Sequence, residues 1–331
     1  MPFTLETVTL FLMKPLTFTF ALIAIVFLIA ACDRAREAGQ TAEPAADAAV
    51  VQDRGSAGCG SFAPTGSSSS RLVSDGIERG FRLHIPEAYA PSTPAPLVLN
   101  FHGLGSNAVQ QELYSGLIGK SDDAGFILAT PEGSGSPQRW YFIDLPGAEV
   151  DDFAFLRALI GHLSDTLCID RSRIYATGMS NGGFMSAALA CEMSDTFAAV
   201  APVAGFTYLP SCDGKPPVPI IVFHGTDDAV VPFAGGNIGL LPAALPGVRE
   251  TAARWAQHNG CGPMPDTERI ASDVALERYA GCSGGAGVHL YVIEGGGHTW
   301  PGALPLPFLA RTTQSIKAAD LIWRFFADHS K

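Results

Sequence analysis

The chain has 331 residues, of which 47% are hydrophobic, and this length fits one large α/β domain or two small ones. Its formal net charge is −11, and it contains no run of Lys and Arg. This balance argues against nucleic acid or an anionic membrane surface as the partner. No Cys-x-x-Cys or His-Glu-x-x-His pattern is present, so a zinc site has little support. We expect that no metal or organic cofactor is needed.

The N-terminus begins with an apolar run that ends in small residues directly before Cys32. This pattern resembles a bacterial lipoprotein signal peptide, whose cleavage leaves the cysteine as a lipidated N-terminus. We therefore expect a signal peptide over 1–31, lipidation at Cys32, and an Ala-rich flexible tether over 32–58. Translation from Met13 instead of Met1 would give a more ordinary signal. Both starts predict export to the cell envelope or beyond, and the alternative is an uncleaved membrane anchor.

The remainder of the chain, 59–331, alternates short apolar runs with segments of helical periodicity. Such alternation predicts a single domain with a mostly parallel central sheet and helices on both faces, in which ligands bind at the carboxyl ends of the strands. We read the runs Ser67–Ser70 and 132–149 as loops. Strands are expected at 81–85, 96–101, 126–130, 174–179, 197–203, 218–223 and 288–293, and helices at 107–123, 151–167, 184–191, 247–258 and 312–328.

The chain is organised around Gly178-Met-Ser180-Asn-Gly182, which lies between an apolar strand and a good helix sequence. In this context, Gly-x-Ser-x-Gly indicates a nucleophile elbow, a strained turn that presents the serine hydroxyl at the sheet edge. Side chains at Gly178 and Gly182 would clash with the strand and the helix. The N-terminus of the helix offers N–H groups to a developing oxyanion. The motif therefore predicts Ser180 as a nucleophile.

A serine hydroxyl needs a base, and the base needs an orienting carboxylate. In the hydrolase fold these follow the serine in the order acid, then histidine. His298 lies in a glycine-rich loop after the last expected strand, and Asp227 and Asp228 follow the strand before it. The spacing His-Gly-x-x-Asp-x-x-Val-Pro favours Asp228 as the acid. The alternative is that both aspartates are turn residues.

Backbone N–H groups of Leu104 and Asn181 are the expected oxyanion donors, because one follows the nucleophile and the other lies in a loop after an early strand. His102 and His224 each precede a glycine at a strand end, and we expect them to stiffen these loops by hydrogen bonding.

Substrate contacts are harder to assign from the sequence. Three aromatic residues near the predicted loops are candidates, with core packing as the alternative: Trp300, Trp140 and Phe206. The Pro- and Leu-rich stretch 302–309 would form an apolar patch for a greasy or insoluble substrate if it were exposed beside the site.

Six cysteines follow Cys32, and 15 pairings among them are possible. Export favours disulfides over buried free thiols. The pairing that we favour is Cys59–Cys168, Cys191–Cys212 and Cys261–Cys282.

Several of these stretches together resemble the polyhydroxybutyrate depolymerase and feruloyl esterase-like family of secreted α/β-hydrolases. The matching stretches are 96–103, 150–155, 170–183, 197–205, 224–228 and 297–302. The resemblance implies the α/β-hydrolase fold and ester hydrolysis through an acyl-enzyme, with Ser180, Asp228 and His298 as the triad. The substrate would be a hydroxyalkanoate, feruloyl or short-chain ester, either a small molecule or a polymer.

Two other functions compete with ester hydrolysis. One is a serine peptidase of the same fold, and the other is a non-catalytic ligand-binding lipoprotein on a hydrolase scaffold. A binding protein of that kind usually lacks a triad member, whereas this sequence has all three. Labelling by a fluorophosphonate probe would separate an enzyme from a binding protein.

Overall fold

The computed structural model describes residues 54–144, 150–239, 241, 243–306 and 310–331. The described part of the chain begins at Arg54, within the predicted tether 32–58. Ser56 ties this start to the sheet, because its N–H donates to the Ile169 carbonyl (3.0 Å) and its hydroxyl accepts from the Ile169 N–H (2.9 Å). The predicted signal peptide, Cys32 and the tether up to residue 53 lie outside the described residues.

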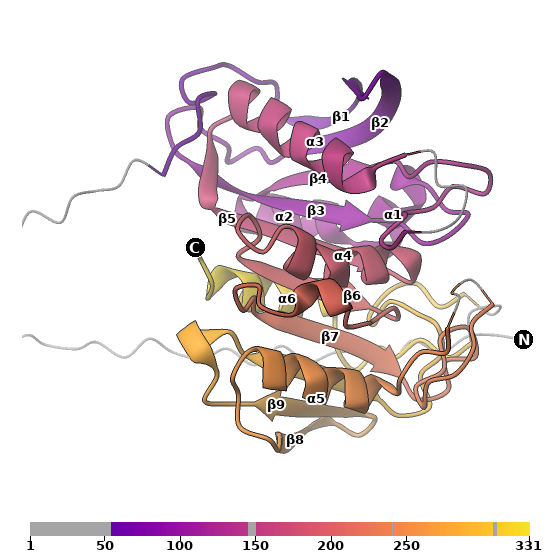
Figure 1. Cartoon of the computed structure of the whole chain (residues 1–331). Coiled ribbons are helices and arrows are strands. Elements are labelled where there is room, and N and C mark those ends of the chain that lie inside the picture. Colours follow the sequence, from indigo (N-terminus) through magenta and orange to yellow (C-terminus); the bar gives the residue numbers. More distant parts are fainter. Residues whose placement is uncertain (1–53, 145–149, 240, 242, 307–309) are drawn as a thin grey trace, which may run out of the picture. The chain divides into compact units, whose positions relative to one another are not determined.

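One twisted sheet runs through the described domain (Figure 1). Its central six strands, β4–β3–β5–β6–β7–β10, are parallel, and an antiparallel pair flanks each side. This confirms the predicted mostly parallel sheet. In spatial order the strands are β1 (Gly66–Ser74), β2 (Ile77–Ile85), β4 (Ile127–Pro131), β3 (Ala95–Phe101), β5 (Ile169–Met179), β6 (Ala199–Val203), β7 (Ile220–Gly225), β10 (Val288–Ile293), β9 (Val274–Tyr279) and β8 (Asp266–Ala271).

Two edge features differ from the sequence-based expectation. The serine run Ser67–Ser70, expected as a loop, lies in β1, which pairs with β2 from Gly66 to Ser74. An edge strand has a partner on one side only and can face water, so it needs no apolar alternation. The β8–β9 hairpin was not predicted for the same reason, because β8 is largely exposed and polar.

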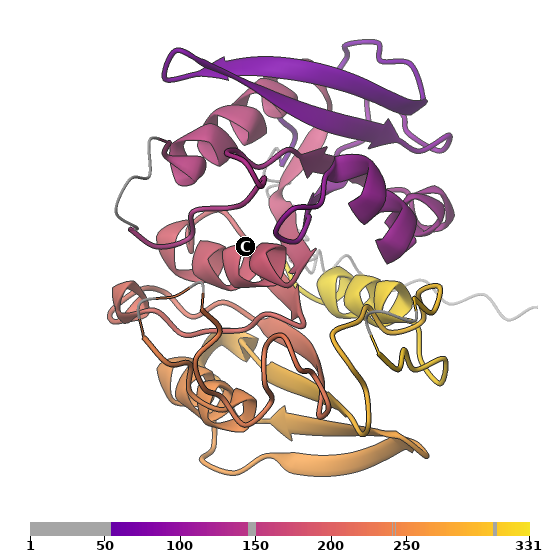
Figure 2. The same cartoon turned by 90° about the vertical axis from the view of Figure 1, so that its right-hand side faces the viewer.

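Helices cover both faces of the sheet (Figure 2). On one face lie α3 (Asp152–Thr166), α4 (Asn181–Glu192) and α5 (Val248–His258), and on the other lie α1 (Ala108–Ser115), α2 (Leu117–Ala124) and α6 (Ala318–Ala327). The helix predicted over 107–123 is broken at Gly116, whose φ of 68° ends α1 in a left-handed cap. No described helix is long and apolar enough to cross a membrane.

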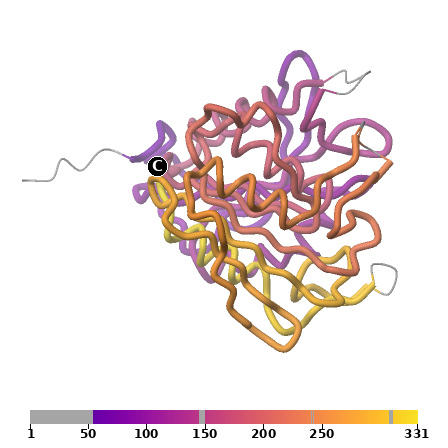
Figure 3. The backbone as a smooth tube through the Cα atoms, turned by 60° about the horizontal axis from the view of Figure 1, so that its bottom comes forward, coloured from indigo at the N-terminus to yellow at the C-terminus, as the bar shows by residue number. Residues whose placement is uncertain are grey.

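The two ends of the described domain lie together at the amino end of β5 (Figure 3). The Arg54 carbonyl accepts from the Arg171 N–H (3.1 Å), and the Lys331 N–H donates to the Ser172 carbonyl (2.9 Å). The loops that follow the parallel strands emerge at the opposite edge of the sheet. The structure contains three disulfides, and they join the same pairs that the sequence analysis favoured: Cys59–Cys168, Cys191–Cys212 and Cys261–Cys282.

Candidate active site

Ser180 occupies a strained turn between β5 and α4. Its φ of 57° and ψ of −119° lie in a region that side chains other than glycine rarely adopt. A Cβ at Gly178 would come within 2.5 Å of the Gly182 carbonyl oxygen, and one at Gly182 within 2.2 Å of the Phe101 carbonyl oxygen. The strand–turn–helix passage therefore requires glycine on both sides of the serine, as the elbow motif predicts.

A third close approach, at Gly205, was not predicted. A Cβ there would lie 2.0 Å from the Ser180 carbonyl oxygen, and the Ser180 N–H donates to the Val203 carbonyl (2.8 Å). The end of β6 thus packs directly against the elbow and holds it in place. The sequence signal was a glycine soon after the predicted strand 197–203.

The aspartate that faces His298 is Asp228. His298 Nδ1 donates to Asp228 Oδ2 at 2.8 Å, and Asp228 Oδ1 accepts from the N–H groups of Val230 (2.9 Å) and Val231 (2.8 Å). Asp227 is exposed and accepts from the Thr226 hydroxyl. With its proton on Nδ1, the His298 ring keeps a lone pair on Nε2, the arrangement that a general base needs.

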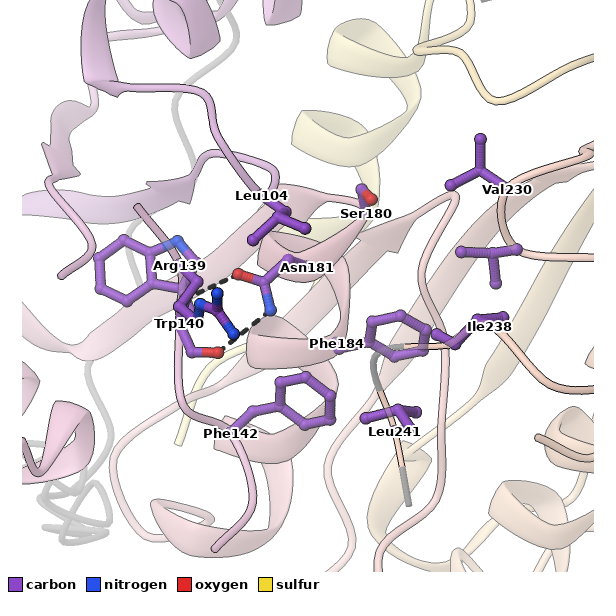
Figure 4. Close-up of a pocket in the computed structure, with 11 residues that line it drawn as sticks. Leu104, Arg139, Trp140, Phe142, Ser180, Asn181, Phe184, Val230, Ile238 and Leu241 are labelled. Carbon is purple, nitrogen blue, oxygen red and sulfur yellow. Dashed lines mark hydrogen bonds between the residues drawn. The ribbon is translucent and has the colours of Figure 1, made fainter. Parts of the chain in front are cut away.

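Ser180 and His298 line one cavity of about 550 Å³ at the carboxyl edge of the sheet. Gly103 lies against the serine, because a Cβ built on it would be 3.4 Å from Ser180 Cβ. Leu104 follows it and stands beside Ser180 and Asn181 (Figure 4). Asn181 opens α4, and the first N–H groups of a helix have no acceptor within it. These are the two positions expected for oxyanion donors.

The two histidines before glycine make the predicted loop contacts. His102 Nδ1 donates to the Gly103 carbonyl (2.8 Å), while Nε2 accepts from the Gly133 N–H (2.9 Å). His224 Nε2 donates to the Val231 carbonyl (2.8 Å). Burial lowers the pKa of both rings, which therefore stay neutral. In the described part of the chain, no three His, Cys, Asp or Glu side chains gather in a way that could hold a metal ion.

The loop after β4 is fixed to the elbow by contacts that the sequence did not reveal. Asn181 Oδ1 accepts from the Trp140 N–H (2.7 Å), and Asn181 Nδ2 donates to the Trp140 carbonyl (3.1 Å). Asp152 Oδ2 accepts from the Tyr141 N–H (2.7 Å), and Asp152 Oδ1 accepts from Arg79 (2.7 Å). The only signal was the position of both polar residues in stretches that carry the family resemblance.

Of the three aromatic candidates for substrate contact, one adjoins the nucleophile. Trp140 lines a second cavity beside Ser180, and its Nε1 donates to the His102 carbonyl (3.1 Å). Trp300 and Phe206 are buried in the core and line neither cavity at Ser180. Both residues follow predicted active-site loops in the sequence, but in the fold their rings pack in the core.

Comparisons with known proteins place the chain among esterases. It is 30% identical to Feruloyl esterase C of Emericella nidulans over 257 residues, covering 75% of this chain and 83% of that protein. It is 34% identical to Feruloyl esterase B of Piromyces equi over 223 residues, covering 64% of this chain. The chain spans only 41% of the length of the Piromyces protein.

Two further comparisons concern the fold. A profile of the Prolyl oligopeptidase family matches residues 117–217. The crystal structure of an acetyl xylan esterase from Aspergillus awamori superposes with a TM-score of 0.57 at 17% identity, covering 78% of this chain and 99% of that one. At this identity the likeness shows the fold alone, and it confirms the α/β-hydrolase architecture.

Proposed function

Because the chain belongs to the feruloyl esterase family of α/β-hydrolases and is a serine ester hydrolase, we propose that it cleaves feruloyl or short-chain carboxylic esters with Ser180, Asp228 and His298 as its catalytic triad. The observation that carries this proposal is the 2.8 Å bond from His298 Nδ1 to Asp228 Oδ2, together with the cavity that both His298 and the strained Ser180 line. The Leu104 and Asn181 N–H groups supply the oxyanion hole.

The proposed reaction proceeds in two steps. His298 Nε2 takes the Ser180 hydroxyl proton as Oγ bonds to the ester carbonyl carbon, and the oxyanion forms at the two backbone donors. The bond to the alcohol oxygen then breaks, and that oxygen receives the proton from His298. Water next gives a proton to His298 and attacks the acyl-enzyme. The acid leaves, and the proton returns to Ser180.

The first prediction tests the nucleophile. Ser180→Ala should lower kcat for p-nitrophenyl acetate and methyl ferulate by about 10⁴-fold or more, because no other group forms the acyl-enzyme. It should also abolish covalent labelling by a fluorophosphonate, while circular dichroism stays unchanged. Ser68→Ala, on the exposed strand β1, is the matched control and should behave like the wild type. Retained turnover or labelling in the alanine variant would overturn the assignment of Ser180.

Hydroxyalkanoate esters of the polyhydroxybutyrate type are a second candidate substrate. Leu113 and Leu304 line the cavity that holds His298, yet they are 78% and 74% exposed. Exposed leucines at the mouth of a site favour an apolar or insoluble substrate. Release of hydroxybutyrate from a polymer film would support this candidate, and activity on soluble esters alone would exclude it.

The match to the Prolyl oligopeptidase family keeps peptide bonds as another candidate substrate. A pair of substrates with the same acyl group separates the two chemistries. Alanine p-nitrophenyl ester should be cleaved, whereas alanine p-nitroanilide should not, because its leaving amine is much poorer. Comparable rates on both would favour the peptidase.

We further propose that the protein is exported, with a signal peptide over 1–31, a tether that follows it, and a lipid on Cys32. Three disulfides fit an oxidising compartment. The tether would enter the domain at the amino edge of β5, opposite the loops that carry the triad. Metabolic labelling with a fatty-acid probe should depend on Cys32 and be lost in Cys32→Ser.

A further inference from the structure

Two cavities meet at Ser180, and the proton transfers of the proposed reaction assign them different roles. The leaving alcohol must receive its proton from His298, so it has to occupy the cavity that His298 lines. The second cavity contains Ser180, Leu104 and Asn181 but is not lined by His298. With the ester carbonyl at the oxyanion donors, the acyl group then extends into this second cavity, which we call the acyl pocket. This step rests on the proposed function.

The acyl pocket is mostly apolar but carries a cation. Most of its wall is built from side chains that offer only carbon: Leu104, Phe142, Phe184, Val230, Ile238 and Leu241 (Figure 4). Among its described lining residues, Arg139 is the only charged one, and none is a carboxylate. Arg139 Nε is buried and has no hydrogen-bond partner in the described structure. A buried N–H without a partner gains more from an anionic acceptor than an N–H that water already solvates.

The backbone holds Arg139 firmly in this position. Its N–H donates to the Ser134 carbonyl (2.9 Å), and its carbonyl accepts from the Ser134 N–H (3.0 Å). The next residue, Trp140, is bound on both sides by the Asn181 side chain. Since Asn181 directly follows the nucleophile, the backbone of Arg139 is fixed relative to Ser180 through a short chain of contacts. Its guanidinium otherwise faces the Tyr141 ring, at 5.9 Å from Cζ to the ring centroid.

We propose that Arg139 is a specificity-determining residue that selects acyl groups carrying a carboxylate at the end far from the ester. A planar guanidinium binds a carboxylate through two parallel hydrogen bonds, and the apolar side chains of the wall favour methylene groups between the two ends. Among the short-chain esters of the proposed function, the preferred substrates are therefore half-esters of short dicarboxylic acids.

The test compares two matched series of methyl esters. Monomethyl succinate, glutarate and adipate are each paired with the methyl ester of the unbranched acid of equal carbon number: butyrate, valerate and hexanoate. For at least one chain length, Arg139→Met should lower the ratio of kcat/KM, acidic over neutral, by about tenfold or more. The ratio for Arg139→Lys should lie between those of the wild type and Arg139→Met, because an ammonium group keeps the charge but cannot form two parallel hydrogen bonds to a carboxylate. In the wild type, about 1 M NaCl should also lower this ratio.

The outcomes are separable. Equal ratios in the wild type and Arg139→Met at every chain length, with no effect of salt on the wild type, would overturn the role of Arg139 while leaving ester hydrolysis intact. Failure of the wild type to cleave any methyl ester or p-nitrophenyl acetate, together with absent fluorophosphonate labelling, would instead overturn the proposed function. If Arg139→Met does not fold, Arg139→Lys and the salt dependence of the wild type decide the matter.

Discussion

The Asp228 carboxylate has hydrogen-bond partners besides His298, and they determine how a substitution of Asp228 would act. Its Oδ1 accepts two backbone N–H groups, so the carboxylate is ordered before any imidazolium forms. His224 lies behind it, with Nε2 3.4 Å from Asp228 Oδ2, and the low pKa of that ring keeps it neutral. The Asp228 charge is therefore available to stabilise a protonated His298.

The second prediction follows from this residue. Asp228→Asn should lower kcat for p-nitrophenyl butyrate by about 10³- to 10⁴-fold, because an amide can hold the wrong tautomer of His298 and offers no charge. Asp227→Asn is a closely matched control, since Asp227 is adjacent in sequence but exposed. It should keep activity within about twofold of the wild type. The acid has been misassigned if the Asp227 variant is the one that loses activity.

At the scale of the element, the loop after β4 depends on a buried ion pair. Arg79 on β2 and Asp152 at the start of α3 are both buried and 2.7 Å apart. Arg79 also lies 4.2 Å from the centre of the Phe155 ring and donates to the Glu132 carbonyl. Burial raises the pKa of Asp152, and the Arg79 charge opposes this shift. The pair thus connects strand β2, helix α3 and the loop that carries Arg139.

The third prediction concerns this pair. Arg79→Met should lower the free energy of unfolding by about 3–5 kcal/mol in urea titrations, because it leaves Asp152 buried without its partner. The control is Arg71→Met, which removes the exposed pair with Glu78 on β1 and β2. Exposed pairs contribute about 0–1 kcal/mol, so the control should change little. Equal effects of the two substitutions would show that the buried pair has no special role.

At this scale, sequence reasoning can locate a residue where its position in the fold depends on its neighbours in the chain. Ser180, Asp228 and His298 each follow a recognisable apolar strand, and parallel strands bring such loops to one edge. It failed where the role depends on packing between distant elements. Asp151 caps α3 and accepts from the Ala154 N–H, whereas the adjacent Asp152 pairs with Arg79. No local pattern reveals that an adjacent carboxylate turns inward to meet an arginine on another strand.

Several histidines of the described domain are packed away from water, and this contributes to its response to acid. Burial lowers the pKa of His102 and His224 in the active-site loops. It also lowers the pKa of His289 on β10 to about 4, with smaller contributions from the charges of Arg278 and His329. His289 packs against Phe325 of α6, remote from Ser180 in the sheet. A substitution of His289 therefore tests the stability of the domain without changing the triad.

The last prediction is that the domain loses stability between about pH 6.5 and pH 4. An unfolded histidine takes up a proton near pH 6.5, whereas the buried ring does so only at lower pH, so acid favours the unfolded chain. The stability is present above about pH 6.5 and is lost as the pH falls. For His289 alone, the loss of unfolding free energy by pH 5 is on the order of 2 kcal/mol.

His289→Gln should reduce the fall in unfolding free energy between pH 7 and pH 5 by roughly this amount, measured in urea. His162→Gln, on the exposed face of α3, should leave the pH dependence unchanged. An identical pH dependence in the His289 variant and the wild type would place the origin of acid sensitivity elsewhere.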